Sequence, residues 1–487
     1  MTPRLSALTR VTSGSTAFDA IIEGGLPVRS LNVIAGAPGA GKTLFCLQML
    51  FALARQGKKC LYLTTLAEPS LKLIHYMQQF SFFDPALMDR EVVFADLGAA
   101  MRKGAEPTLR EIASRVEREE PAILVIDSFK AIRDILGEPA ALRTFVYDLA
   151  VHAASWGATT LLVGEYTDAE VASHAEFAIA DGIIRFENSR RELTAIREVE
   201  VLKLRGTNYV TGAHFYEIDG DGLSFFPRVR GPDERTLGEM GPVAAPERVS
   251  TGVAGLDAML GGGLPRASAS IVQGGTGTGK TLLGLQFLLD GARRGEPGIH
   301  WLLEETPDQL RGFAQSVGWD LPAFEERGLL QLSYVSPVEL STDRFLDRAR
   351  REVERLGARR AVLDSLTSLA LGVPSDRRFR ELVYAVAKHL HVRGVTLAMN
   401  MEVPDLLGSA QLSGHGVSFA ADNVIQLKFV EIDGHLERGL SVLKVRGMRH
   451  ATDVRRLSVE TGGVQVGAPF EGLRGVLTGL PVPTKGS

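Results

Sequence analysis

The sequence predicts an α/β protein with two tandem domains, each a mostly parallel sheet covered by helices on both faces. Three observations carry this prediction. The chain contains an internal duplication, apolar strands alternate with helices, and a glycine-rich motif joins a strand to a helix in both copies. With 487 residues, 45% of them apolar and 23% charged, the chain can bury sizeable cores and is too long for one small domain.

The duplication is visible in segments that match at a nearly constant spacing. RVTSGSTAFDAIIEGGLP from Arg10 returns as RVSTGVAGLDAMLGGGLP from Arg248, and VLKLRG in the first half returns as VLKVRG in the second. Between the halves, residues 231–246 are polar, are marked by Gly and Pro, and lack apolar periodicity. We therefore place an N-terminal domain at 1–230, a linker at 231–246 and a C-terminal domain at 247–487.

Strand and helix signals alternate within the first half. We expect helices at 42–56, 108–119 and 142–156, where apolar residues recur with the helical period. The short apolar runs LNVIAG, KCLYLTT, AILVID and TTLLVGE predict strands. This alternation is typical of a parallel sheet, whose ligands bind at the carboxyl ends of the strands.

Each half contains a motif of the form G-x-x-x-x-G-K-[ST] after a strand and before a helix. In this motif, backbone N–H groups cradle phosphates, the Lys reaches the β- and γ-oxygens, and the hydroxyl binds Mg²⁺. Two copies in register favour two nucleotide sites over simple glycine-rich turns. The predicted nucleotide-binding residues of the motifs are Gly36, Gly39, Gly41, Lys42 and Thr43 in the first half and Gly274, Gly277, Gly279, Lys280 and Thr281 in the second.

An aspartate ends the apolar strand downstream of each motif. These residues are Asp127 in the first half and Asp364 in the second. We expect them on the Mg²⁺ side of a phosphoryl-transfer site, together with the hydroxyls of Thr43 and Thr281. Their alternative role is to cap the helix or turn that follows the strand.

A pair of carboxylates distinguishes the second half. Glu304 and Glu305 follow the strand IHWLL, where a carboxylate can polarise an attacking water or accept a proton from a hydroxyl. The repeat places Leu66 and Ala67 opposite them, so we expect the first half to bind ATP without this acid pair. The alternative is an alignment displaced by one residue at a frayed strand end. Were the first half to have another base, Glu165 at the end of TTLLVGE would be the candidate.

Composition excludes several classes of protein. The formal net charge is −4, without blocks of one sign, which argues against a nucleic-acid or anionic-membrane surface. Two cysteines, Cys46 and Cys60, are too few for a zinc ribbon or a disulfide framework and fit a reduced compartment. The sequence shows neither a secretory signal nor a membrane span, so we expect a cytoplasmic protein.

The motif set resembles the KaiC family, which comprises the cyanobacterial clock protein and its bacterial relatives. The likeness rests on two phosphate-binding motifs, GGLP before each of them, an EE-TP element in the second half and a K-[LV]-RG element near each end, and it covers essentially the whole chain. It implies a RecA-like fold in each half and a two-tiered hexamer with ATP between protomers. It also implies slow ATPase activity, Ser/Thr autophosphorylation in the second tier, and a KaiB-like or other signalling partner.

The resemblance also assigns roles to the K-[LV]-RG elements. In the family, their Lys and Arg reach ATP on the neighbouring subunit, and here they are Lys203, Arg205, Lys444 and Arg446. Such cations spread transition-state charge in phosphoryl transfer, so we assign catalysis to Glu304, Glu305, Lys280, Lys444 and Arg446. The alternative is that the four cations only solvate an edge strand.

The family's Ser-Thr phosphorylation site is altered in this sequence. The segment HGVSFAAD retains Ser418 as a candidate phosphoacceptor but has Phe419 where the family has Thr. One hydroxyl is compatible with a single-site kinase and not with an ordered two-site cycle, and Ser418 could equally be an ordinary loop serine. The tail after Phe470 is also shorter than the segment that the activator KaiA captures in the clock proteins, so regulation of that kind is not expected.

Three functions are weighed against one another. The preferred one is an oligomeric, KaiC-like signalling or timing ATPase that uses ATP and Mg²⁺ and autophosphorylates on serine. The second is a DNA-dependent ATPase of the RadA or DnaB kind, against which stand the balanced charge and the lack of a basic aromatic loop for single strands. The third is a binding module in which nucleotide only holds the structure together.

Overall fold

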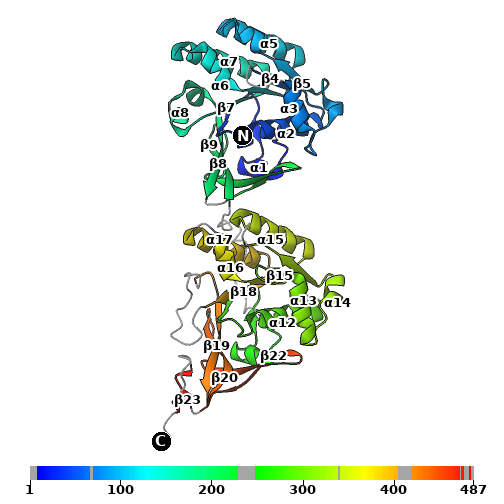
Figure 1. Cartoon of the computed structure of the whole chain (residues 1–487), viewed down its shortest axis with the longest axis vertical. Coiled ribbons are helices and arrows are strands. Elements are labelled where there is room, and N and C mark those ends of the chain that lie inside the picture. Colours follow the sequence, from blue (N-terminus) through cyan, green and yellow to red (C-terminus); the bar gives the residue numbers. More distant parts are fainter. Residues whose placement is uncertain are drawn as a thin grey trace, which may run out of the picture. The chain divides into compact units, whose positions relative to one another are not determined.

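The chain folds into two compact units, residues Met1–Arg228 and Val229–Ser487. The computed structural model describes residues 8–65, 70–191, 194–228, 247–337, 340–373, 375–403, 419–471, 473–476 and 482–483. The predicted linker at 231–246 lies outside these residues. Each unit is described by itself (Figure 1).

The first unit contains a nine-stranded sheet in the order β5-β4-β6-β7-β3-β8-β9-β10-β11. The strands from β5 to β8 are parallel and the last three are antiparallel. Their bounds are β5 (Val92–Asp96), β4 (Cys60–Thr64), β6 (Ile123–Asp127), β7 (Thr159–Glu165), β3 (Leu31–Gly36), β8 (Gly182–Arg191), β9 (Thr194–Leu204), β10 (His214–Asp219) and β11 (Gly222–Phe226). A two-stranded ribbon of β1 (Arg10–Val11) and β2 (Leu26–Pro27) precedes this sheet.

The second unit repeats this topology strand for strand. Its sheet has the order β16-β15-β17-β18-β14-β19-β20-β21-β22, again parallel as far as β19 and antiparallel beyond it. The bounds are β16 (Leu330–Tyr334), β15 (Gly298–Leu302), β17 (Arg360–Asp364), β18 (Thr396–Glu402), β14 (Ala269–Gly274), β19 (Asn423–Ile432), β20 (His435–Val445), β21 (Arg455–Glu460) and β22 (Gly463–Pro469). Short ribbons pair β12 (Arg248–Val249) with β13 (Leu264–Pro265) and β23 (Leu473–Arg474) with β24 (Val482–Pro483).

Helices cover both faces of each sheet (Figure 1). In the first unit they are α1 (Thr16–Ile21), α2 (Lys42–Ala54) and α3 (Ser70–Met77) on one face, and α4 (Gly98–Met101), α5 (Ala105–Glu119), α6 (Phe129–Leu136), α7 (Pro139–Trp156) and α9 (Ala175–Ile179) on the other, with α8 (Asp168–Ser173) before α9. In the second unit they are α11 (Ala254–Met259), α12 (Lys280–Arg293), α13 (Pro307–Ser316) and α14 (Pro322–Glu326), facing α15 (Thr342–Leu356), α16 (Leu366–Leu371) and α17 (Asp376–Val392) across the sheet.

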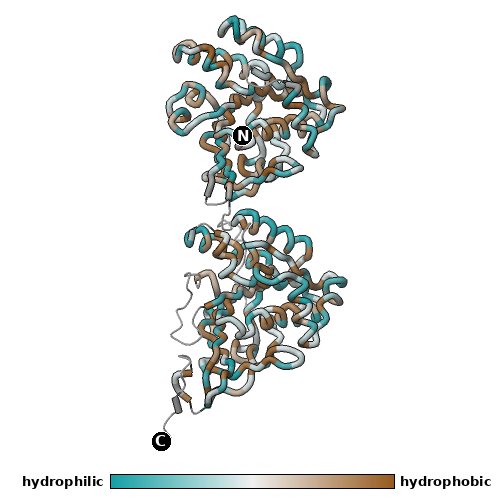
Figure 2. The backbone as a smooth tube through the Cα atoms, in the orientation of Figure 1, coloured by the Kyte–Doolittle hydropathy of each residue, from teal (hydrophilic) through white to brown (hydrophobic). Residues whose placement is uncertain are grey.

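The apolar cores explain this layering. Neighbouring strand residues such as Val33 and Ile34 belong to different buried clusters, because successive side chains of a strand point to opposite faces. The helices contribute apolar stripes at helical spacing, such as Ile112 and Val116 of α5. Figure 2 shows the alternation of hydrophilic and hydrophobic segments along outer helices such as α5 and α15.

The predicted α/β class with tandem, mostly parallel sheets is confirmed. The helices expected to start at residues 108 and 142 begin earlier, at Ala105 and Pro139. In α7 the added turn starts with a proline, which is tolerated in a first helical turn because its missing N–H would have no partner there.

Cys46 and Cys60 are both buried and neither forms a disulfide. Burial raises the pKa of the Cys60 thiol to about 12 and that of Cys46 well above its usual range. Among the described residues, none of the helices is both long and apolar enough to span a membrane.

Candidate nucleotide sites

The first phosphate loop connects β3 to α2. Gly36, Gly39 and Gly41 have φ angles of 150°, 71° and 86°, in the region that favours glycine. A Cβ on Gly36 would lie 1.9 Å from a carbonyl oxygen of β8, so the close approach of β3 and β8 requires glycine there. Lys42 begins α2, and its Nζ donates a hydrogen bond to a carbonyl oxygen of the loop at 2.7 Å. The loop therefore has the geometry of a phosphate cradle at a helix N-terminus.

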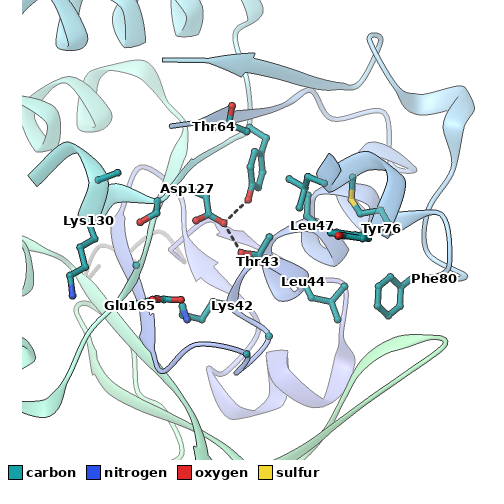
Figure 3. A pocket seen from close by; sticks show the side chains of 18 of the residues that line it. Lys42, Thr43, Leu44, Leu47, Thr64, Tyr76, Phe80, Asp127, Lys130 and Glu165 are labelled. Carbon is teal, nitrogen blue, oxygen red and sulfur yellow. Dashed lines mark hydrogen bonds between the residues drawn. The ribbon is translucent and has the colours of Figure 1, made fainter. Parts of the chain in front are cut away.

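Asp127 at the end of β6 faces this loop, as Figure 3 shows. Its Oδ2 accepts hydrogen bonds from Thr43 Oγ1 at 2.7 Å and from the Tyr62 hydroxyl at 2.6 Å. Because Thr43 donates its proton to Asp127, its oxygen lone pairs stay available for a cation. Burial lowers the pKa of Lys42, and the negative charges of Glu165 and Asp127 oppose that effect.

A cavity of about 700 Å³ opens above the first loop. Figure 3 shows its two sides: Lys42, Thr43, Asp127, Lys130 and Glu165 on the polar side, and Leu44, Leu47, Tyr76 and Phe80 on the apolar side. The apolar side is formed by Leu44 and Leu47 of α2 and by the segment that contains α3. The first site therefore combines a polar phosphate-binding loop with an adjoining apolar pocket.

The second loop, between β14 and α12, has the same backbone design. Gly277 and Gly279 have φ angles of 77° and 103°, and a Cβ on Gly274 would lie 2.5 Å from a carbonyl oxygen of β19. Lys280 Nζ donates to the carbonyl oxygens of Gly274 and Gly275, both at 2.8 Å. The cavity here is smaller, about 240 Å³.

The acid pair predicted from the sequence lines this second cavity. Both Glu304 and Glu305 follow β15 and are exposed at its rim. Ser365 Oγ and Ser368 Oγ both donate hydrogen bonds to Glu304 Oε1 at 2.5 Å, which fixes that carboxylate. Partial burial, together with the negative charge of Asp364, raises the pKa of Glu305. A carboxylate with a raised pKa accepts protons more readily, as a general base must.

Asp364 is the second aspartate predicted on the Mg²⁺ side. It ends β17, lines the cavity and is 9% exposed. Burial alone would raise its pKa, but the neighbouring His300, Thr281 and Asn400 favour the charged form more strongly, so the pKa lies below its usual value. Asp364 is therefore an anion at neutral pH, as a metal-side carboxylate has to be.

The residues present fit ATP and Mg²⁺. Both cradles place N–H groups, a lysine and a hydroxyl at a helix N-terminus, with glycines where a Cβ would collide. The described residues contain no group of three His, Cys, Asp or Glu side chains that could cage a metal. Each site offers one hydroxyl and one carboxylate, Thr43 with Asp127 and Thr281 with Asp364, and Mg²⁺ is commonly bound by one or two protein oxygens together with substrate phosphates and water.

One residue of the second site was missed by the sequence reasoning. Glu402 ends β18 beside the phosphate loop and accepts a hydrogen bond from Thr276 Oγ1. Burial lowers the pKa of Lys280, and Glu402 makes the largest opposing contribution. Glu402 occupies the strand position of Glu165 in the first unit, so the shared ending of TTLLVGE and TLAMNME was the available signal.

The cations assigned to the neighbouring subunit's ATP lie away from their own cavities. In the first unit, Lys203 Nζ donates to the carbonyl oxygens of Phe177 and Ala178 at 3.3 and 3.1 Å, and Arg205 lies 3.5 Å from Asp181. Neither cation is among the described residues that line the first cavity.

The second unit repeats this arrangement. Lys444 Nζ donates to the carbonyl oxygen of Ala421 at 2.7 Å, and Arg446 lies 3.5 Å from Asp422. As in the first unit, neither belongs to the described lining of its own cavity. The two Lys-Arg pairs therefore occupy equivalent positions in the two units, and neither pair lines the described cavity of its own unit.

Several predicted positions cannot be placed. Ser418, Leu66 and Ala67 lie outside the described residues. Phe419 is described and half exposed, and its ring stacks on Tyr384 of α17 with centroids 6.2 Å apart.

Two mostly parallel sheets, each with a phosphate cradle at its carboxyl edge, define a tandem RecA-like nucleotide-binding protein. The sequence matches the family described as ATPase: KaiC over residues 11–230 and 249–471, and the chain belongs to the KaiC family. It is 30% identical to the circadian clock oscillator protein KaiC of Parathermosynechococcus lividus, with 98% of this chain and 89% of the relative aligned. The clock protein of the same name from Acaryochloris marina is 29% identical, with coverages of 97% and 91%.

Proposed function

We propose that this protein is an oligomeric, KaiC-type signalling ATPase in which the second site hydrolyses ATP and the first site holds it. The observation that carries the proposal is the presence of Glu304 and Glu305 at the rim of the second cavity, which also contains Lys280. In the first cavity the acids among the described lining residues are Asp127, Asp134 and Glu165.

The roles of the residues follow from their positions. Lys280 and the loop N–H groups bind the phosphates, while Thr281 and Asp364 hold the cation, which supplies charge neutralisation when it is bound. Glu305, with its raised pKa, suits proton removal from water, and Ser365 and Ser368 keep Glu304 beside it. Glu402 keeps Thr276 in place at the mouth of the loop.

Assembly supplies the remaining charge in this proposal. Lys203, Arg205, Lys444 and Arg446 would contact nucleotide on the next subunit of a homo-oligomer, most simply a hexamer. Support comes from their equivalent positions in the two units and from their absence among the described lining residues of their own cavities. Cations supplied across an interface accelerate phosphoryl transfer by several powers of ten.

Serine autophosphorylation is the finer part of the proposal. Ser418 is the candidate acceptor, with Glu304 or Glu305 of a neighbouring subunit as its base. We place the protein in the cytoplasm, with a KaiB-like or other signalling partner as its output.

The test is phosphate release and ³²P retention by purified protein with Mg²⁺ and ATP. Glu304→Gln combined with Glu305→Gln is expected to lower release at least about 100-fold, because the general base is lost. Retained label that disappears in Ser418→Ala would support the kinase step, whereas release without retained label would leave an ATPase alone. A double variant with most of its activity intact contradicts the assignment of the second site. Stimulation by single-stranded DNA would instead favour the DNA-dependent motor.

A further inference from the structure

A buried polar cluster lies directly behind the second site. Asp364 on β17 is flanked by His300 on the neighbouring strand β15 and by Asn400 on the other neighbour, β18. These three side chains lie on one face of the sheet, the face that α12 covers at Gly284. His300 and Asn400 are both fully buried.

Within the part of the chain that the structure describes, several polar atoms of this cluster have no hydrogen-bond partner. Both ring nitrogens of His300, both side-chain amide atoms of Asn400 and Oδ2 of Asp364 are buried and unpaired. His300 Nε2 lies 3.8 Å from Asp364 Oδ2, which is too long for a direct hydrogen bond. Buried polar atoms are nearly always paired, through ordered water where no protein group reaches. Of these atoms, His300 Nε2 and Asp364 Oδ2 lie close enough to be bridged by one water, and the Asp364 carboxylate is the one that the second site needs.

In the first unit, a different side chain provides a hydrogen-bond donor to the equivalent aspartate, Asp127. Tyr62 occupies the place of His300, as the third residue of the corresponding strand, and donates directly to Asp127 at 2.6 Å. Val163 occupies the place of Asn400, and the register pairs it with Asp127 as Asn400 pairs with Asp364. A phenol hydroxyl and an apolar side chain thus replace the imidazole and the amide.

We propose that His300, supported by Asn400, is a positioning residue that holds the Asp364 carboxylate toward the cation of bound ATP, through one buried water bridging the three side chains. In the first unit the Tyr62 hydroxyl takes the place of that water. The inference rests on the proposed function, because Asp364 needs to be held in this orientation only if the second site binds ATP and a cation. Residues that orient a metal ligand from behind commonly change metal affinity or activity 10- to 100-fold when replaced.

Two substitutions at one position test this role. His300→Phe removes both ring nitrogens and keeps an aromatic ring, while His300→Tyr imports the hydroxyl that the first unit uses. Both are placed in the full chain with Lys42→Ala, so that nucleotide binding reports on the second site. The readouts are the gain in affinity for a fluorescent ATP analogue when Mg²⁺ is added, and the Mg²⁺ concentration that gives half-maximal phosphate release.

We expect His300→Phe to reduce the Mg²⁺-dependent gain in affinity about 10-fold and to raise the Mg²⁺ requirement similarly, with affinity in EDTA unchanged. His300→Tyr is expected to stay within about threefold of the parent, since it restores a donor to Asp364. Equal behaviour of His300→Phe and the parent overturns the inference, and so does equal damage in the Tyr and Phe variants. Should His300→Phe fail to fold, Asn400→Val, which copies the first unit, decides by the same readouts.

The outcomes separate this inference from the proposed function. Wild-type protein that binds Mg²⁺ and ATP together but releases no phosphate contradicts the proposed hydrolysis, and the affinity measurement in the Lys42→Ala background still decides the role of His300. A parent protein that hydrolyses ATP while its His300 variants keep the normal Mg²⁺ response overturns the positioning role alone. No Mg²⁺-dependent binding in the parent overturns both.

Discussion

The two nucleotide sites share one sheet topology but differ in what surrounds their phosphate loops. The first cavity is about 700 Å³ and half apolar, whereas the second is about 240 Å³ and carries the acid pair Glu304 and Glu305. The order of equivalent strands is the same in both units, and the last two glycines of each motif have positive φ angles. The comparison teaches that a duplicated framework can keep two cradles while substitutions at a few strand positions give them different chemistry.

The largest expected difference in stability between the two units lies at the start of β17 and of its equivalent, β6. Arg360 begins β17 and is fully buried, with its guanidinium 2.8 Å from Glu296 and 3.2 Å from Asp290, whereas Ile123 begins the equivalent β6. We expect Arg360→Leu to destabilise the second unit by about 3–5 kcal/mol, because two partly buried carboxylates each lose one of two arginine partners and two backbone carbonyl oxygens lose a donor. Thermal unfolding checks this, with Ile123→Val as the matched change, expected to cost about 1 kcal/mol.

Acidic pH should reduce the difference in stability between the wild type and the Arg360→Leu variant. Burial alone would raise the pKa of Glu296, but Arg266 and Arg360 more than offset it, so its pKa is lowered. A lowered pKa stabilises the fold above the unfolded value of about 4.3, and the contribution is lost as the pH falls below it. The stability gap between wild type and Arg360→Leu should therefore shrink below about pH 4.3. A gap that is constant or widens on acidification would contradict this assignment.

The lysines offer a direct comparison of turnover. We expect Lys280→Ala to lower phosphate release by about 10²–10³-fold, as is typical for losing a group that stabilises transition-state charge. Lys42→Ala should weaken assembly and leave release per assembled subunit within about threefold. Steady-state assays run beside light scattering test both statements. Equal losses of turnover in the two variants would mean that both sites hydrolyse ATP.

Nucleotide should stabilise the assembled protein. Ligand at about 100 times its dissociation constant adds about 2.7 kcal/mol by linkage, so ATP should raise both particle size and melting temperature. Lys42→Ala should remove most of the change in size. A protein that stays monomeric with and without ATP would defeat the assembly proposal.

The smallest expected effect concerns the support of Glu304. Ser368 donates to Glu304, and the equivalent residue of the first unit is Ala131. Ser368→Ala removes one of two hydrogen bonds to this carboxylate, which should cost about 1 kcal/mol, or roughly fivefold in turnover. The reverse change, Ala131→Ser, should leave turnover unaltered because the acid pair belongs to the second site. A marked loss in the reverse variant would place catalysis in the first unit.

Sequence patterns could predict the framework because periodicity and spacing are local. The repeat, the two cradles and the aspartates at the ends of β6 and β17 all follow from short segments read in order. The repeat offered a signal for Glu402 itself, but its effect on the pKa of Lys280 could not be read from short segments, since it depends on β18 lying beside β14 in the sheet. The same holds for the closeness of His300 to Asp364 and for the ion pair of Arg360 with Glu296, since in both cases the two residues come from different elements.

Because both cysteines are buried, we expect the native chain to react very little with thiol-specific reagents. Only the thiolate reacts, and because burial raises the pKa of Cys60 to about 12 and that of Cys46 well above its usual range, almost no thiolate is present at neutral pH. A single cysteine introduced on an exposed helix position could therefore carry a fluorescent or spin label without removing the native ones. Labels placed in this way would test the proposed assembly, because a distance between labels on two copies of the chain should appear as ATP is added.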